Sequence, residues 1–274
     1  MAIITITRGL HSGGEALAQA VATALGARCV SGEVLREAAR QFNVPEEKIT
    51  QVFEGTPGFW ERMTESRRIY LAYIQAQLAD WVKDDNVVYH GNGGQELLRD
   101  VPHVLKVRVI VPIERRVQLI MERFKQSREQ AEAFVERIDD ERTRRTRYLF
   151  NTDWRDARRY DISLNMARLS MDDAKEIILS TAKKPIFTLD AAKRQAFQDF
   201  LLKSRVMALV AHSLVGRLSL INVTVANGVV KLQGTLTSNE AMVEQLVDQV
   251  RQVEGVKGVE NEIVVGLVYQ EWNV

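Results

Sequence analysis

The chain has 274 residues, 46% hydrophobic and 27% charged, which is the composition of an ordinary globular protein long enough for two domains. Its 37 basic and 36 acidic residues leave a formal net charge of +1, so no overall field draws it onto nucleic acid or an anionic membrane. The single cysteine, Cys29, excludes an intramolecular disulfide and fits a reducing compartment. No stretch approaches the roughly 20 apolar residues that span a bilayer, and the N-terminus lacks signal-peptide character. We therefore expect a cytoplasmic protein with no nucleic-acid partner.

Hydrophobic patterning in the first two thirds of the chain predicts strands that alternate with helices. The expected strands are the short apolar runs 3–7, 86–89, 105–111 and 162–165. Helical spacing is expected at 15–25, 32–42, 46–53, 60–83, from about 114, at 127–148 and at 171–182. Apolar strands separated by helices are typical of a parallel sheet that is covered on both faces. The predicted fold class of this part is therefore α/β.

The pattern changes after Lys183-Lys184-Pro185, where a proline follows the end of a helix. An apolar helical face from Phe197 to Leu214 precedes two short strands, which flank Ala226-Asn227-Gly228. An Asn-Gly pair between apolar runs is the strongest local signal for a hairpin. A further helix and strand follow. We predict a first domain at 1–183, a linker at 184–194 and a small α+β domain at 195–274.

A glycine-rich segment follows the first predicted strand, which itself ends at Arg8. The layout is that of a phosphate-binding loop: a strand, then Gly9-Leu10-His11-Ser12-Gly13-Gly14, then a helix. In such a loop the backbone N–H groups and the start of the helix attract an anion. The working pattern is G-x-x-x-x-G-K-[ST]. Here Glu15 stands in the lysine position, and Ala16 stands where the Mg²⁺-binding hydroxyl belongs.

The exchange of that lysine for a glutamate is chemically severe, because the lysine neutralises the β- and γ-phosphates. One charge pair at about 4 Å and an effective dielectric of about 20 is worth roughly 4 kcal/mol. Reversing the sign therefore weakens phosphate binding unless Glu15 turns away or is paired. Arg8 and His11 are candidate replacement cations, and Ser12 is a candidate hydroxyl. A tight turn that binds nothing would give the same local pattern.

Residues 3–15, Ile-Ile-Thr-Ile-Thr-Arg-Gly-Leu-His-Ser-Gly-Gly-Glu, resemble the opening of the cytidylate kinase-like family, where a strand leads into Ser-Arg and then Gly-Ser-Gly-Gly-Arg. Further matches keep the family's order. Val87–Gly94 resembles a strand ending in Gly-Arg-Gly, Val104–Arg116 the next strand and helix, and Ile138–Asp161 the lid segment with the stretch after it. The resemblance covers roughly 1–182. It implies a P-loop nucleoside monophosphate kinase fold that uses ATP and Mg²⁺, with no other cofactor and no metal site of its own.

The residues that differ from the family's pattern lie at the positions where the family binds its substrates. Ser31-Gly32 with Arg36 is similar to the Ser-Gly element that helps to hold the monophosphate. The central Asp-Gly-Arg-Asp falls on His90-Gly91-Asn92-Gly93, which loses two carboxylates and an arginine. His90 would lie at the carboxyl edge of the sheet, as an acceptor contact or as a hydrogen-bonded structural histidine. In the lid segment, Arg142 and Arg145 are candidate phosphate contacts, against the alternative of a solvated helix face.

The resemblance and the residue chemistry together define two candidate groups. The candidate phosphate- or nucleotide-binding residues are Arg8, Gly9, His11, Ser12, Gly13, Gly14, Glu15, Arg142 and Arg145. The candidate acceptor-binding residues are Ser31, Arg36, His90 and Asn92. No residue is assigned a catalytic role.

Residues from about 195 to 265 resemble the BON domain, a small module of bacterial proteins. The segments that carry the resemblance are Val223–Gly234, which spans the hairpin, and Val253–Val259, which spans a helix-to-strand turn. The resemblance implies a protein or lipid partner. No lysine-rich face supports attraction to lipid, so we favour a protein or ligand interaction.

Three functions are consistent with the sequence. A nucleoside monophosphate kinase would transfer a phosphoryl group from ATP to CMP or a similar acceptor. A degenerate kinase fold would bind a nucleotide or another phosphate-bearing small molecule and signal through the BON-like domain. A structural protein would use both domains for assembly, including assembly into a homo-oligomer. The missing lysine and hydroxyl favour the second, whereas the first rests on analogy of fold.

Overall fold

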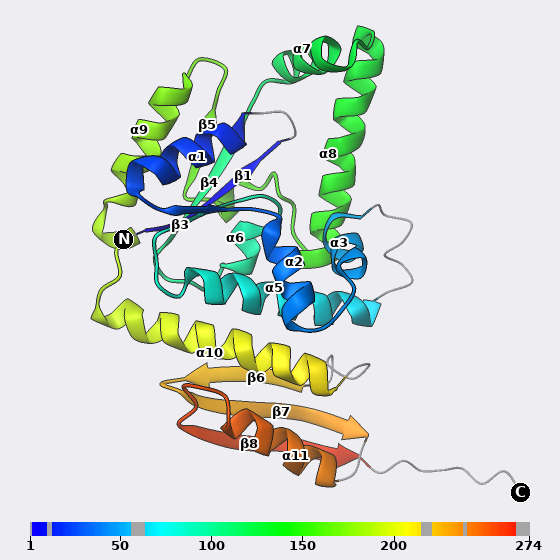
Figure 1. Ribbon diagram of the computed structural model, residues 1–274, viewed down its shortest axis with the longest axis vertical. Helices are drawn as coiled ribbons and strands as arrows, with labels where there is room; N and C mark the ends of the chain where they lie inside the picture. The colour runs from blue at the N-terminus through cyan, green and yellow to red at the C-terminus, as the bar shows by residue number, and fades with distance from the viewer. Residues whose placement is uncertain (1, 10–12, 56–63, 215–220, 238–239, 267–274) are drawn as a thin grey trace, which may run out of the picture.

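The computed structural model describes the chain except for residues 1, 10–12, 56–63, 215–220, 238–239 and 267–274. Its larger unit is built on a five-stranded parallel sheet in the order β2-β3-β1-β4-β5 (Figure 1). The strands are β1 (Ile3–Arg8), β2 (Arg28–Val30), β3 (Val87–His90), β4 (Val104–Ile110) and β5 (Ile162–Asn165). Four of the five were predicted, and the prediction of an α/β parallel sheet is confirmed. The remaining strand, β2, has three residues and was not predicted.

Helices cover both faces of the sheet because apolar side chains of adjacent strand residues point to opposite sides. Ile3, Val87 and Tyr89 face a core that includes residues of α2 (Glu33–Gln41), α3 (Glu46–Glu54) and α5 (Thr64–Val82). Ile4 and Val88 face a second core, with α1 (Gly14–Leu25) and α9 (Met171–Ala182). The short helix α6 (Gly94–Leu97) follows β3, and a 3₁₀ turn, η1 (Ala157–Arg159), precedes β5.

A helical arm, α7 (Ile113–Phe124) and α8 (Arg128–Phe150), lies beside the sheet (Figure 1). Its two helices pack on each other through a small core of their own, formed by Val117, Ile120, Ala131 and Val135. The Ser127 side chain accepts a hydrogen bond from the Gln130 amide, and the Gln130 side chain accepts one from the Ser127 amide, which caps the start of α8. The arm places the second half of α8 against the carboxyl end of β1.

The smaller unit follows a 3₁₀ turn, η2 (Pro185–Phe187), which lies in the predicted linker 184–194. It contains α10 (Ala191–Ser213), β6 (Ile221–Ala226), β7 (Val229–Thr237), α11 (Glu240–Arg251) and β8 (Gly258–Gly266). The predicted hairpin is confirmed: β6 and β7 are antiparallel, with Asn227 and Gly228 at φ 52° and 82°. The Asp199 carboxylate on α10 accepts hydrogen bonds from both turn amides at 2.8 Å, and β8 pairs parallel to β7.

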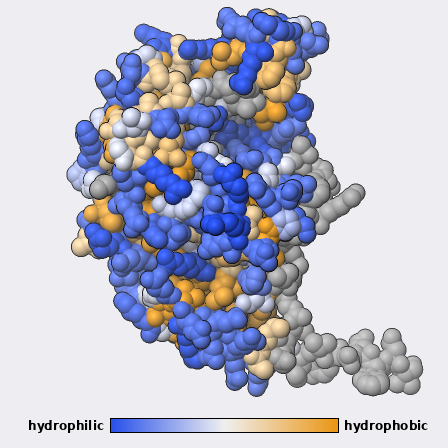
Figure 2. Space-filling view, viewed as in Figure 1, coloured by the Kyte–Doolittle hydropathy of each residue, from blue (hydrophilic) through white to orange (hydrophobic). Residues whose placement is uncertain are grey.

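Helix α10 joins the two units, because it lies against α5 on one side and β6 on the other (Figure 1). On the face shown in Figure 2, hydrophobic residues gather where α10 lies. The buried rings of Phe197 on α10 and His103 in the larger unit meet edge to face, with centroids 4.9 Å apart. His103 in turn contacts Asp85 at 2.7 Å. A single hydrophobic core therefore runs from α5 through α10 into the three-stranded sheet.

Every helix in the described ranges is too short or too polar to span a bilayer.

Two substitutions test the shared core. Phe197→Ala will lower the free energy of unfolding by about 3–5 kcal/mol, because it opens a cavity between the two units. Phe124→Ala, which removes a ring from a residue that is 49% exposed on α7, will cost at most about 1 kcal/mol. Urea unfolding followed by circular dichroism measures both. Equal losses for the two variants would contradict a core shared across the junction.

Candidate functional site

The phosphate loop begins where β1 ends. Arg8 is the last strand residue, Gly13 has φ 69°, and α1 starts at Gly14. A Cβ on Gly14 would lie 2.2 Å from a carbon of the Arg8 side chain, so only glycine fits there. His11 and Ser12, two predicted site residues, lie outside the described residues. The described ends of the loop place Arg8 and Glu15 beside each other.

A second glycine-rich turn ends the neighbouring strand. Because β1 and β3 are parallel, with Ile6 opposite His90, their carboxyl ends meet at one edge of the sheet. Gly93 has φ 67°, and a Cβ there would lie 2.8 Å from the ring of Phe150 at the end of α8. The Tyr89 hydroxyl donates a hydrogen bond to the carbonyl of Asn92 at 3.0 Å. The turn is thus fixed between the sheet and the arm.

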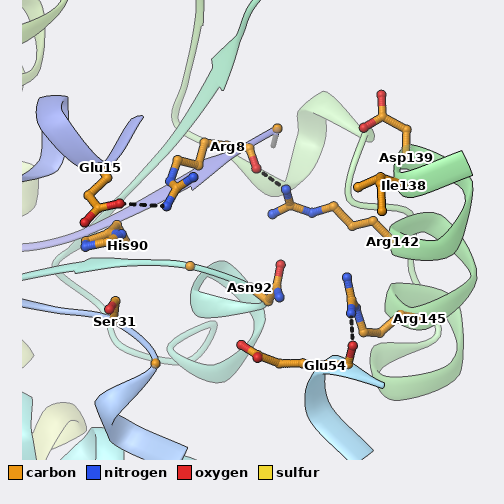
Figure 3. Close-up of a pocket in the computed structure, with 13 residues that line it drawn as sticks. Arg8, Glu15, Ser31, Glu54, His90, Asn92, Ile138, Asp139, Arg142 and Arg145 are labelled. Atoms are coloured by element: carbon orange, nitrogen blue, oxygen red, sulfur yellow. Dashed lines mark hydrogen bonds and ion pairs between the residues drawn. The ribbon is translucent and has the colours of Figure 1, made fainter. Parts of the chain in front are cut away.

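A cavity of about 310 Å³ lies between these two turns and α8 (Figure 3). It is lined by Arg8, Gly9, Glu15, Ser31, Gly32, Glu54, His90, Gly91, Asn92, Ile138, Asp139, Arg142 and Arg145. The structure therefore brings together most of the described candidates from both predicted groups. Gly13 and Gly14 are not among the lining residues, although they shape the loop.

The glutamate in the lysine position faces an arginine of the same loop. Arg8 Nη2 and a Glu15 carboxylate oxygen are 3.8 Å apart, and the Glu15 side chain is 76% exposed. An ion pair this open to water contributes little to stability. Its effect on the cavity is larger, because the carboxylate offsets the charge that Arg8 offers to an incoming phosphate.

Arg142 is a buried cation that holds α8 against the phosphate loop. Its Nη1 donates to the carbonyl of Arg8, and its guanidinium lies 4.4 Å from the centroid of the Trp154 ring. Burial lowers the pKa of Arg142 to about 10, which leaves the group charged at neutral pH. The Trp154 indole N–H donates to the Thr143 hydroxyl at 3.1 Å and fixes the ring. Arg142 thus lines the cavity from a rigid position.

Arg145 enters the cavity one turn further along α8. Its Nη1 donates to the backbone carbonyl of Glu54 at the end of α3, and burial lowers the pKa of Arg145. Figure 3 shows the Glu54 side chain on the cavity side of α3. Arg144 and Arg147 are exposed, as expected for helix positions that face away from the site. The helical period therefore sorts the lid arginines into two that line the cavity and two that do not.

Arg116 on α7 is a part of the site that the sequence analysis missed. It is 6% exposed, and its two terminal nitrogens bind the two oxygens of Asp139 at 2.7 and 2.8 Å. A Cβ on Gly9 would lie 3.4 Å from the Arg116 guanidinium carbon, so the pair borders the phosphate loop. It neutralises the Asp139 carboxylate, which lines the cavity. In sequence Arg116 is one member of a charged helical run, and nothing there marks it as buried.

His90 lies at the inner end of the cavity, next to Glu15 in Figure 3. The residue is 8% exposed, and its buried Nδ1 has no hydrogen-bond partner among the described residues. Burial lowers the pKa of His90, nearby Arg8 lowers it further, and the carboxylates of Glu15 and Glu33 oppose that shift. Nδ1 of His90 is therefore a buried polar atom that a bound ligand could satisfy.

The acceptor side of the cavity differs from the expected arrangement. Both the amide and the hydroxyl of Ser31 donate to the Glu33 carboxylate, at 2.7 and 2.8 Å. These bonds lower the pKa of Glu33 against the opposing effect of burial. Arg36 is exposed on α2 and does not line the cavity, whereas Asn92 does. The predicted acceptor group is thus represented at the cavity by Ser31, His90 and Asn92.

The residues present do not match the usual Mg²⁺–ATP arrangement of a P-loop. Glu15 adds negative charge where a triphosphate needs neutralisation, and Ala16 offers no hydroxyl to a metal. No group of three His, Cys, Asp or Glu side chains is placed to hold a metal ion within the described part of the chain. Cys29, on β2 nearby, has its pKa raised by burial and by Glu33 and Glu15, as expected for an unreactive thiol.

Family comparison decides the identity of the larger unit. The model of the cytidylate kinase-like family matches residues 3–168, more than half of the chain. The chain belongs to the cytidylate kinase-like family. The BON domain model matches residues 198–266, so this member carries a BON domain after its kinase-like unit. Both predicted resemblances are confirmed.

Several solved structures are similar to part of this chain at low sequence identity. An uncharacterized protein from Eubacterium ventriosum is 19% identical with a TM-score of 0.48, covering 66% of this chain and 97% of its own. Shikimate kinase from Bacteroides thetaiotaomicron is 14% identical with a TM-score of 0.41. The match covers 67% of this chain and 99% of that kinase. Dephospho-CoA kinase from Campylobacter jejuni is 14% identical with a TM-score of 0.37. The match covers 66% of this chain and 96% of that kinase. A search of curated proteins finds no significant match.

The burial of His90 makes stability depend on pH. Because burial lowers its pKa, the unfolded chain takes up a proton at about pH 6.5 that the folded chain resists. The free energy of unfolding will therefore fall as the pH drops from about 7 to about 5.5. In His90→Asn this fall will be smaller by up to about 1 kcal/mol, as urea unfolding at the two pH values measures.

The exposed histidine on α10 provides the matched control. His212→Asn removes an imidazole that does not line the cavity, and the pH dependence of His90→Asn is compared with that of this variant. An unchanged pH dependence in His90→Asn would mean that His90 does not resist protonation in the folded state.

Proposed function

We propose that this member of the cytidylate kinase-like family binds a nucleotide or another phosphate-bearing small molecule in the cavity, as a regulatory module rather than as an efficient kinase. The observation that carries the proposal is the convergence of Arg8, Arg142 and Arg145 on one cavity beside the phosphate loop. Arginine suits phosphate because its planar guanidinium offers paired donors.

The charges around the cavity favour binding over phosphoryl transfer. Glu15 opposes the charge that builds on a transferred phosphoryl group, and the loop supplies neither lysine nor hydroxyl in the usual places. A ligand with one phosphate and several hydrogen-bond donors suits the cavity better than a triphosphate. Its phosphate would meet the arginines, and its hydroxyl or amino groups would meet Glu15 and Glu54.

The regulatory part of the proposal is supported by the junction between the units. A ligand that binds only the folded form stabilises it by mass action. Because the core of the kinase-like unit continues through α10 into the BON domain, that stabilisation extends to the BON domain. The BON domain would then present its partner with a surface whose rigidity depends on the ligand. Nucleoside monophosphate kinase activity is the alternative, favoured by the fold alone.

A ligand panel tests binding at the cavity. In thermal unfolding with nucleoside mono-, di- and triphosphates and pyrophosphate, at least one compound will raise the midpoint, by an amount that grows with concentration. Glu15→Gln will tighten binding of that compound about three- to tenfold, because a screened carboxylate is removed, and Glu15→Lys will tighten it further. Titration calorimetry measures the affinities.

Glu129→Gln, which removes an exposed carboxylate at the far end of α8, is the control and will leave the affinity unchanged. If no compound of the panel raised the unfolding midpoint, the proposal that the cavity binds phosphate would be overturned. Formation of nucleoside diphosphate from ATP, Mg²⁺ and a monophosphate would instead establish the kinase alternative.

A further inference from the structure

Two adjoining hollows lie on the other side of the end of α8 from the candidate site. The first, of about 580 Å³, is lined by Arg67, Leu71, Gln75, Glu96, Leu97, Arg99, Arg147, Tyr148, Leu149, Phe150 and Asn151. The second, of about 320 Å³, is lined by Arg67, Arg68, Leu71, Ala72, Gln75, Leu149 and Met207. Because they share four residues, they form one groove between α5, α6, α8 and α10, here called the arginine groove. It shares no lining residue with the candidate site.

Arg67 gives the groove a cation that no carboxylate of the described residues neutralises. Its Nη1 donates to the carbonyl of Tyr148, and its guanidinium carbon lies 4.8 Å from the centroid of the Tyr148 ring. Among the described residues that line the groove, Glu96 is the only acid; it is 7% exposed, and both of its oxygens are bound by Arg159. The groove therefore carries positive charge that its own lining does not balance.

Two further arginines are held only loosely. Arg147 lies 3.4 Å from Asp153, which also pairs with Arg155, and the Arg147 side chain is 63% exposed. Arg99 lies 3.4 Å from its sequence neighbour Asp100, with both side chains more than half exposed. Exposed pairs of this kind are weak, so an anion bound in the groove can replace either carboxylate.

Apolar side chains contribute to the lining of the groove beside its polar groups. They are Leu71, Leu97 and Leu149, with Met207 of α10, a residue of the BON domain, in the second hollow. Each of the two volumes falls within the usual range for small-molecule sites, roughly 300–1,000 Å³. A lining that combines arginines with leucines fits a molecule that carries more than one negative charge and an apolar part.

We propose that the arginine groove is a second ligand site, which binds a small organic molecule carrying at least two negative charges and an aromatic or aliphatic body. Arg67, Arg99 and Arg147 meet the charges, and the leucines meet the apolar part. The proposal is independent of the function of the first cavity.

The groove is placed to act on the first cavity through α8. Arg145 faces the cavity and Arg147 faces the groove, although they lie two residues apart on one helix. Phe150 lines the groove and packs against Gly93 in the turn after β3. A ligand in the groove therefore contacts the same helix end that positions the site arginines.

Titration of the full chain with bis-ANS, an aromatic dianion whose fluorescence rises on binding, tests the proposal. The double variant Arg67→Gln/Arg147→Gln is expected to weaken dye binding about five- to tenfold, because it removes two of the groove's cations. Arg147→Gln alone, at an exposed position that leaves the fold intact, is expected to weaken it about two- to threefold. The neutral dye phenylnaphthylamine is expected to bind equally to all variants.

A control of equal charge is Arg128→Gln/Arg137→Gln, which removes two exposed arginines from the other end of α8. It is expected to bind bis-ANS like the unmodified chain, whereas Arg145→Gln reports only on dye that enters the first cavity. Equal loss of affinity in the groove variant and this control would overturn the proposal. So would loss in Arg145→Gln alone, which would assign the dye to the first cavity.

Discussion

The site geometry depends on the buried guanidinium of Arg142. A charge removed from water is costly unless protein groups replace its hydration, and here a backbone carbonyl of the phosphate loop and the face of Trp154 do so. Because the carbonyl belongs to Arg8, the interaction joins the arm to the end of β1. The cavity between them exists at its observed width because this contact fixes α8.

Other charged contacts lie on either side of that one. Arg116 and Asp139 form a buried pair between α7 and α8 beside Gly9, and Arg145 reaches the end of α3. Both cations and carboxylates line the cavity, and Glu15 sits against Arg8. Such a site has little net charge of its own. Selectivity would come from matching the positions of donors and acceptors in a ligand, more than from general attraction of anions.

Sequence patterns predicted most of the fold and part of the site, for physical reasons. Buried parallel strands are continuous apolar runs, and the Asn227-Gly228 turn needs a backbone conformation that few residues adopt, so both leave clear signals. The strand β2 has three residues and its first is exposed, so it leaves none. The Arg116–Asp139 pair and the arginine groove arise from contacts between distant segments, which periodicity cannot reveal. The domain boundaries at 183 and 195 remain a prediction.

The position of α10 has a consequence for how the two modules could have been combined. A chain ending at residue 183 would keep every strand of the five-stranded sheet, yet it would leave the apolar outer side of α5 facing water. The BON domain released alone would likewise present the uncovered side of α10. Neither unit is therefore a module that could be transferred unchanged to another protein. Recombination with another partner would require new side chains along α5, and expression of either half alone should favour aggregation.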